Sequence, residues 1–184
     1  MTPDEVWHFW FDGDGAARRA VWFQRDDAFD AACARFTEAA REARSGALDG
    51  WATTPRGALA LVLLLDQFPR NLFRGSAEAF ASDAHARQIA RRIVAAGFDA
   101  SLTPVERIFA YLPFEHSEDL ADQDESIRLF TALHDALGGE TLDYAERHRD
   151  VIRRFGRFPH RNAALGRVNT PQEAAYLAEP GAGF

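Results

Sequence analysis

The stretch LALVLLLDQFPRN, residues Leu59 to Asn71, decides the fold of this chain. Its residues up to Leu65 are apolar on every face of a helix, which predicts the central and most buried helix of the protein. Proline lacks an N–H and disfavours helical geometry in the residue before it, so we expect this helix to end at Phe68-Pro69. Asp66 and Arg70 should then point outward from its end.

Helix signals recur on both sides of this stretch. Three segments place a threonine, a proline and a glutamate in the order of a capping box, and they begin at Thr2, Thr103 and Thr170. Pro113 is expected to end the helix that starts after Thr103. No segment alternates apolar and polar residues with β-branched enrichment, so the sequence predicts no sheet. We therefore expect a single all-α domain, residues 1–184, with seven or eight helices.

Composition narrows the class of protein. The formal net charge is -7 and the pI is about 5.3, which argues against binding to nucleic acid or to an acidic membrane surface. The longest apolar run, Ala58 to Leu65, is too short to cross a bilayer. The lone Cys33 excludes an internal disulfide, and the glycine pairs do not follow strands as phosphate-binding loops do. We expect a soluble cytoplasmic protein without a cofactor.

Three polar motifs stand out against this apolar background. They are DQFPRN (Asp66 to Asn71), PFEHSED (Pro113 to Asp119) and FGRFPHRN (Phe155 to Asn162). The segment from Glu115 to Asp143 holds nine acidic residues and one arginine, whereas the segment from Arg147 to Arg167 holds seven arginines and a single aspartate. Because the two segments are opposite in charge, we expect the three motifs to dock on one another around a common cleft.

The motifs supply two sets of candidate site residues. The candidate ligand-binding residues are Asp66, Arg70, Asn71, Arg157, Arg161 and Asn162, and the candidate catalytic residues are Glu115, His116, Asp119 and His160. The arginines offer bidentate forks for phosphate or carboxylate, and the asparagines could orient a ligand. A histidine tuned by a neighbouring carboxylate could serve as general base for hydrolysis, with arginines stabilising negative charge.

Two other interpretations of the same residues stay open. A metal site would use Glu115, His116 and His160, with Glu118 or Asp119 as a further ligand, but no recognised metal-binding spacing is present, so no metal is predicted. Alternatively, the charged residues form a structural network of ion pairs that holds helix ends together without any ligand. The sequence does not choose between a site and such a network.

The strings LLDQFPRN, LPFEHSED and FGRFPHRN also carry a family resemblance. Together with Trp7, Phe9, Trp10 and Phe11 near the start of the chain and Leu165-Gly166-Arg167 near its end, they resemble the bacterial domain of unknown function family 924. This resemblance covers essentially the whole chain. It implies a right-handed α–α superhelix similar to tetratricopeptide folds, although no 34-residue repeat is legible here. It implies no activity.

These observations lead to one main hypothesis and two alternatives. The main hypothesis is a helical protein that binds a small anionic molecule in an Arg, His and carboxylate cleft, with hydrolysis of that molecule as an extension. The first alternative is a tetratricopeptide-like module that binds a protein or an acidic peptide without catalysis. The second is self-association into a homo-oligomer through the Trp-rich first helix.

Overall fold

A computed structural model describes residues 1–138 and 140–183, and the regular structure within these residues is entirely helical. The α-helices are α1 (Pro3–Phe11), α2 (Asp27–Cys33), α3 (Thr37–Arg44), α4 (Pro55–Val62), α5 (Phe68–Leu72), α6 (Asp83–Ala95), α7 (Pro104–Glu115), α8 (Leu120–Leu137), α9 (Glu140–Phe155) and α10 (Pro171–Leu177). Short 3-10 turns are η1 (Ala20–Trp22), η2 (Ala34–Phe36), η3 (Asp49–Thr53), η5 (Ala77–Phe80), η6 (Phe98–Ser101) and η7 (Pro159–Arg161). The predicted all-α class is confirmed.

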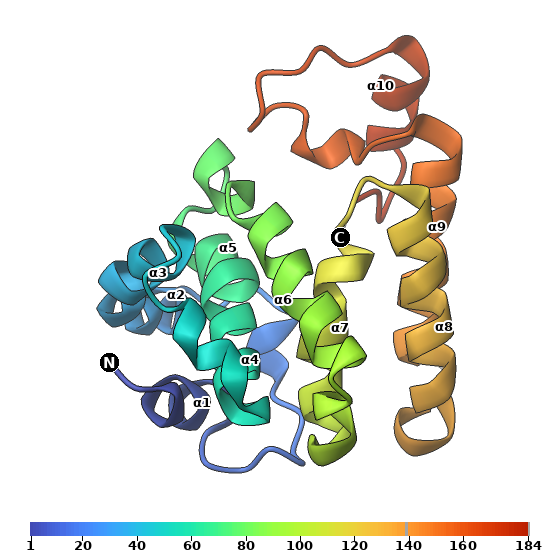
Figure 1. The fold of residues 1–184 in the computed structure, drawn as a ribbon. Coiled ribbons are helices and arrows are strands. Elements are labelled where there is room, and N and C mark those ends of the chain that lie inside the picture. The colour runs from blue at the N-terminus through green and yellow to red at the C-terminus, as the bar shows by residue number, and fades with distance from the viewer. Residues whose placement is uncertain (139, 184) are drawn as a thin grey trace.

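The helices are arranged as a progression along the chain (Figure 1). The N-terminal helices α1 to α3 lie at one side, α4 to α7 follow, and the long pair α8 and α9 stands at the other side. Helix α4 packs against α1, α6 and α7, while α8 packs between α7 and α9. The C-terminal segment with η7 and α10 lies at one end of this array. No helix in the described ranges is both long and apolar enough to cross a membrane.

The prediction of a central buried helix is confirmed. Every residue from Leu59 to Leu65 is fully buried, as is the neighbouring Phe68. This run forms the middle of the main hydrophobic core, and burying each of its large side chains contributes roughly 1.5 to 3 kcal/mol before the loss of conformational entropy is counted. The site residues that follow the run are therefore attached to the most rigidly packed part of the chain.

The aromatic residues of α1 belong to this same core. Thr2 caps the helix and forms the expected capping box with Glu5. The ring of Trp10 is 1% exposed and lies within 5.6 Å of the rings of Phe68 and Phe109, measured between ring centroids. Both tryptophans of this helix, Trp7 and Trp10, are thus buried inside the chain.

The expected helix end at Phe68-Pro69 is wrong. The helix continues through a π-helical turn, η4 (Leu63–Gln67), directly into α5. In an α-helix the carbonyl of Leu65 would accept a hydrogen bond from the nitrogen of Pro69, which has no hydrogen to donate. Instead, the hydroxyl of Ser82 donates to that carbonyl at 2.6 Å. The wider π turn together with this side-chain donor lets the chain remain helical across the proline.

Helix α7 also passes its proline. Pro113 lies inside the helix, which continues to Glu115, so the expected end at Pro113 is wrong as well. The proline stands in the last turn, where the loss of one backbone donor interrupts little of the helix that precedes it. The two additional residues matter for the site, because they place Glu115 at the end of α7 and His116 directly after it.

Candidate functional site

The π turn presents Asp66 to the inside of the protein, so the expectation that this residue points outward is wrong. Asp66 is fully buried, and its carboxylate oxygens lie 2.8 and 2.9 Å from Nδ1 of His116. The side-chain amide of Gln67 donates to the same carboxylate at 2.5 Å. Burial alone raises the pKa of a carboxyl group, but the charge of Arg70 and the hydrogen-bonded His116 hold the pKa of Asp66 below its usual range.

The pairing with Asp66 fixes the chemistry of His116. An ionised carboxylate can only accept hydrogen bonds, so Nδ1 of His116 carries the hydrogen and Nε2 keeps its lone pair. Burial and the positive charge of Arg70 lower the pKa of His116, although Asp66 opposes this shift. The imidazole is therefore neutral at pH 7. The result is a histidine held by a carboxylate in one tautomer, an arrangement that general bases and metal-binding histidines share.

Two arginines share one further carboxylate beside this pair. Arg70 donates from both terminal nitrogens to Asp83, at 3.0 and 3.1 Å, and also lies 3.2 Å from Asp66. Arg161 reaches the same Asp83 through Nη1 at 3.4 Å, and this is its one ion pair with the residues that the structure describes. The carboxylate of Asp83 is thus engaged mainly by Arg70, and Arg161 is left with a long and shared contact.

The guanidinium of Arg161 is buried between two aromatic rings. Its central carbon lies 4.5 Å from the ring centroid of Phe158 and 4.8 Å from that of Phe80, while its side chain is 7% exposed. Nε of Arg161 is buried and has no hydrogen-bond partner among residues 1–138 and 140–183. Burial and the neighbouring Arg70 lower the pKa of Arg161 to about 10, so the group stays charged at neutral pH.

Other buried arginine nitrogens differ from that of Arg161. Nε also has no hydrogen bond within the described ranges in Arg87, Arg149 and Arg167. The side chains of these three residues are between 20 and 25% exposed, so water can reach their guanidinium groups. Arg161 is therefore the most buried of these four arginines, and its single ion pair is long and shared with Arg70.

A second carboxyl–histidine contact lies directly behind His116. Oε1 of Glu115 is 3.2 Å from Nδ1 of His148, which also lies 2.8 Å from the carbonyl oxygen of Tyr144. Burial and the negative charge of Asp66 raise the pKa of Glu115 to about 8, and burial lowers the pKa of His148 well below its usual value. Both groups are neutral at pH 7, so their contact joins two neutral groups and is not an ion pair.

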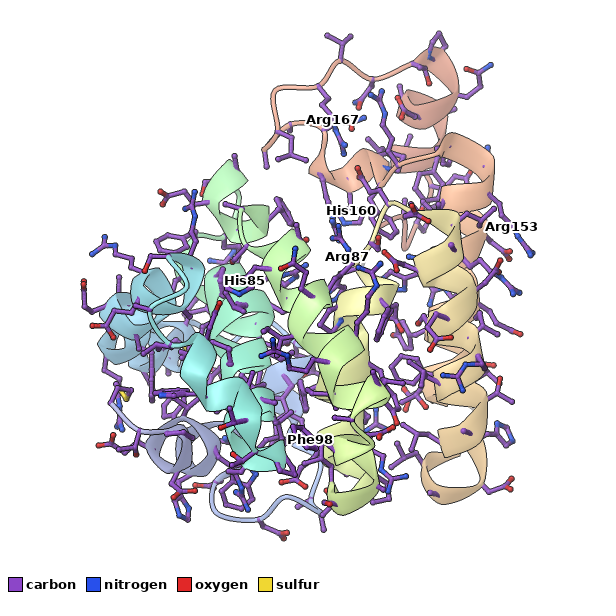
Figure 2. All side chains as sticks on the ribbon, viewed as in Figure 1. His85, Arg87, Phe98, Arg153, His160 and Arg167 are labelled. Atoms are coloured by element: carbon purple, nitrogen blue, oxygen red, sulfur yellow. The ribbon has the colours of Figure 1, made fainter. Side chains whose placement is uncertain are left out.

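His160 completes the set of histidines and comes from the turn η7. Its ring lies 5.5 Å from that of Phe158, between centroids, and burial and the charge of Arg161 lower its pKa to about 4. Figure 2 shows this side chain pointing from the C-terminal segment toward the remaining helices. Gly183 lies against it, because a Cβ atom at this glycine would be 3.3 Å from Cβ of His160.

The cluster therefore gathers only part of the predicted site. Asp66, Arg70, Glu115, His116 and Arg161 lie in it, and His160 stands next to it within reach of the charge of Arg161. These residues come from all three polar motifs, as the predicted docking of the motifs requires. The motif Phe155 to Asn162 packs onto the start of α8 through Glu118, whose carboxylate accepts from the backbone N–H of Phe158 and from Arg167.

Four predicted site residues lie elsewhere and have structural partners. Asn71 donates to the carbonyl of Gln67 on its own helix, and Asn162 donates to Asn169 at 2.7 Å. Arg157 forms a fork with Glu173, at 2.6 and 2.8 Å. Asp119 is the N-cap of α8 and accepts from the backbone N–H of Ala121. Within residues 1–138 and 140–183, no side-chain hydrogen bond or ion pair joins these four residues to Asp66, His116 or Arg161.

Sequence reasoning missed Asp83 and Phe80. Asp83 holds both arginines of the cluster, and Phe80 covers one face of Arg161. In the sequence Asp83 resembles an ordinary first-turn acidic residue, which the positive end of a helix dipole favours. The local pattern gives no signal that two distant arginines converge on it. The structure also places His148 against Glu115 and against Phe158.

The metal interpretation finds no geometric support. Among the residues that the structure describes, no group of three or more His, Cys, Asp or Glu side chains is arranged to hold a metal ion.

A hollow of about 370 Å³ lies between α6, α7 and α8, and no predicted site residue lines it. The charged groups around this hollow are already paired, Arg91 with Asp122 and Glu125 with Arg128.

Comparison with known proteins assigns the chain to a family. Residues 6–181 match the family described as "Bacterial protein of unknown function (DUF924)", and the chain belongs to this family. A solved structure of a protein of unknown function from Agrobacterium tumefaciens is similar to it, with 43% sequence identity, a TM-score of 0.87 and coverage of 97% of each chain. No curated protein matches the chain.

Proposed function

We propose that this protein binds a small anionic molecule at Arg161. The observation that carries this proposal is the state of that guanidinium: it is 7% exposed, its ion pair with Asp83 is 3.4 Å long, and that carboxylate is already held by both nitrogens of Arg70. A buried charge with so little compensation is costly. An anion whose oxygens accept hydrogen bonds from Arg161 offsets this cost, so the free protein is arranged in advance for such a ligand.

The pair of Asp66 and His116 supports hydrolysis as a second part of the proposal. The neutral His116 can take a proton from water through Nε2 while Asp66 stabilises the imidazolium that forms. The hydroxide produced in this step adds to the electrophilic centre of the substrate, and His116 then returns the proton to the leaving group. Arg161 would hold the anionic group of the substrate and orient it relative to His116.

Isothermal titration calorimetry of the purified protein with sodium phosphate, sodium sulfate and sodium acetate tests the binding proposal. The wild type should bind at least one of these anions, and Arg161→Met should weaken the binding at least about tenfold. The control is Arg153→Gln. Arg153 is 51% exposed, makes only contacts of 3.9 Å, and points away from the protein on the outer side of α9 (Figure 2). Equal binding by the wild type and Arg161→Met contradicts the proposal.

Hydrolysis requires its own experiment. A panel of p-nitrophenyl esters and phosphates that carry an additional carboxylate should release p-nitrophenol with the wild type and not with His116→Ala. His134→Ala is the control, because His134 lies on the exposed face of α8. If the wild type releases no product beyond the buffer rate, or if His116→Ala retains full activity, the catalytic part is wrong and the binding part is unaffected.

Three finer expectations from the sequence remain proposals. We propose a tetratricopeptide-like superhelix, which the ordered packing of α6, α7, α8 and α9 supports. We propose a cytoplasmic location, which the free and buried Cys33 supports, because free thiols are typical of reducing compartments. Binding of an acidic peptide in place of a small molecule would use the same Arg161. In that case the peptide, but not the small anions, would produce heat in the titration.

A further inference from the structure

Three arginines of this chain bind a carboxylate along the same edge of the guanidinium, the edge formed by Nε and Nη2. Arg74 contacts Asp30 through Nε and Nη2, at 3.1 and 2.9 Å. The same two nitrogens connect Arg128 to Glu125, at 2.8 and 2.6 Å. Arg157 holds Glu173 in the same way, as described above. Each of these contacts is a planar fork in which two parallel N–H groups meet the two oxygens of a carboxylate.

The corresponding edge of Arg161 carries no carboxylate from the described residues. Nη1 is the atom that contacts Asp83, while Nε is buried without a hydrogen-bond partner in those residues. The rings of Phe80 and Phe158 both pack against this guanidinium, with centroids 4.8 and 4.5 Å from its central carbon. With Nη1 engaged, the Nε–Nη2 edge is the part of the guanidinium that the described residues leave without a carboxylate.

The surrounding charges restrict the ligand further. The carboxylates of Asp83, Glu118 and Asp66 all lie close enough to act on the charge of Arg161. These three groups repel a dianion more strongly than a monoanion, while Arg70 and Arg161 attract both. The histidines that face Arg161, which are His116, His148 and His160, are neutral near pH 7 and add no positive charge to hold a second negative one.

We propose that the ligand of this site is a small monocarboxylate, held side-on by Nε and Nη2 of Arg161, and that phosphate and sulfate are poor ligands. This inference rests on the proposed function and specifies the chemical class of its ligand. The two in-plane donors match the two coplanar oxygens of a carboxylate, as they do in the three internal pairs of this chain. A dianion such as phosphate or sulfate can also meet the fork, but the carboxylates around Arg161 repel its two charges more strongly than the single charge of a carboxylate.

Titrations at matched ionic strength test whether the site prefers monocarboxylates to phosphate and sulfate. Acetate, propionate and benzoate should each bind at least about tenfold more tightly than inorganic phosphate or sulfate at pH 7.5, and Arg161→Lys should remove most of the difference because lysine has no planar fork. Arg153→Gln should behave as the wild type. If phosphate or sulfate binds as tightly as the carboxylates, the preference is overturned while the anion site stands. If no anion binds, the proposed function fails as well.

NMR spectroscopy can observe the Nε–Nη2 edge of Arg161 in the folded wild type, so the result does not depend on the stability of a variant. In the wild type labelled with ¹⁵N-arginine, saturating acetate should shift the Nε–Hε signal of Arg161 and leave that of Arg157 unchanged, because Arg157 already holds Glu173. The Arg161 signal is assigned as the one that Arg161→Lys lacks. A shift caused by phosphate and not by acetate, or a shift of exposed arginines alone, contradicts side-on binding of a carboxylate.

Discussion

Arg157 and Arg161 lie close together in the same motif, Arg157 before the turn η7 and Arg161 at its end, yet they are held in opposite ways. Nε and Nη2 of Arg157 both donate to Glu173, Nη2 also donates to the carbonyl of Val168, and the side chain is 29% exposed. Arg161 is 7% exposed and has one long contact with a carboxylate that another arginine shares. The sequence leaves a structural network and a ligand site as alternatives. We assign the network to Arg157 and propose Arg161, in the same motif, as the ligand site.

The contrast shows what separates the two roles. An arginine with a structural role has its fork filled by the chain and part of its surface in water, so its charge is compensated without a ligand. Arg161 packs against the rings of Phe80 and Phe158, and its Nε has no hydrogen-bond partner among the described residues. Counting arginines in a motif gives both residues the same weight. The difference appears only when the partner of each nitrogen is known.

Removing Asp83 should have the largest effect on stability. Asp83→Asn leaves two buried guanidinium groups with a neutral partner, and the free energy of unfolding should fall by about 3 kcal/mol. Urea unfolding followed by circular dichroism measures this change. Asp124→Asn is the control, because Asp124 is 56% exposed, and its change should stay within about 0.5 kcal/mol. A loss below about 1 kcal/mol for Asp83→Asn contradicts the assigned role of this carboxylate.

Glu115 should make stability fall as pH rises. Its pKa is raised from 4.5 to about 8, so the folded chain holds a proton that the unfolded chain releases. This contribution to stability is complete below about pH 4.5 and is lost as pH rises through about 8. Glu115→Gln removes this pH dependence of stability. The free energy of unfolding of the variant should therefore rise relative to that of the wild type by on the order of 1 kcal/mol per pH unit in this window. As a control, the stability of Glu146→Gln, a change at an exposed residue, should follow that of the wild type across pH 5 to 9. If the stability of Glu115→Gln also runs parallel to that of the wild type, the burial of a neutral Glu115 is contradicted.

Arg157 should contribute a smaller and purely structural amount. Arg157→Met removes the fork on Glu173 and loosens the attachment of α10, so we expect a modest decrease in melting temperature. Titration with acetate should give the same dissociation constant as the wild type, because no contact joins Arg157 to the cluster around Asp66. If this variant loses binding together with Arg161→Met, the separation of the two arginines is wrong.

The smallest expected effect is on histidine titration. Burial and the charge of Arg161 lower the pKa of His160, and burial and the charge of Arg70 lower that of His116, so both should titrate below the usual value near 6.5 in NMR spectra. Acetate bound at Arg161 brings a negative charge beside them and should move both values upward. Histidine signals that titrate normally in the free protein, or that ignore acetate, contradict the position of the ligand.

The sequence predicts the helices well and the site only in part. The apolar run up to Leu65 and the capping boxes are local signals, and the structure confirms the buried helix that the run predicts. The π turn was not predictable in this way, because helical spacing assumes a constant period and the compensating donor, Ser82, lies on another segment. The proline rule failed for that reason, and the outward direction of Asp66 failed with it.

The motifs correctly bring Asp66, His116 and Arg161 to one place, since opposite charges and shared helix ends favour their docking. They do not separate members of the cluster from residues that serve turns and caps, such as Asn162 and Asp119. The decisive partner, Asp83, carries no special pattern in the sequence. Its role depends on the packing of α6 against α5 and η7, which is a tertiary property and not a local one.

The most direct test of the central claim is the stability of Arg161→Met in the absence of ligand. Arg70 keeps Asp83 paired when Arg161 is removed, so this variant should unfold in urea at a free energy within about 1 kcal/mol of the wild type or above it, and acetate should no longer stabilise it. A loss of about 3 kcal/mol or more, with the response to acetate preserved, would show that Arg161 is a structural residue and that the anion site does not depend on it.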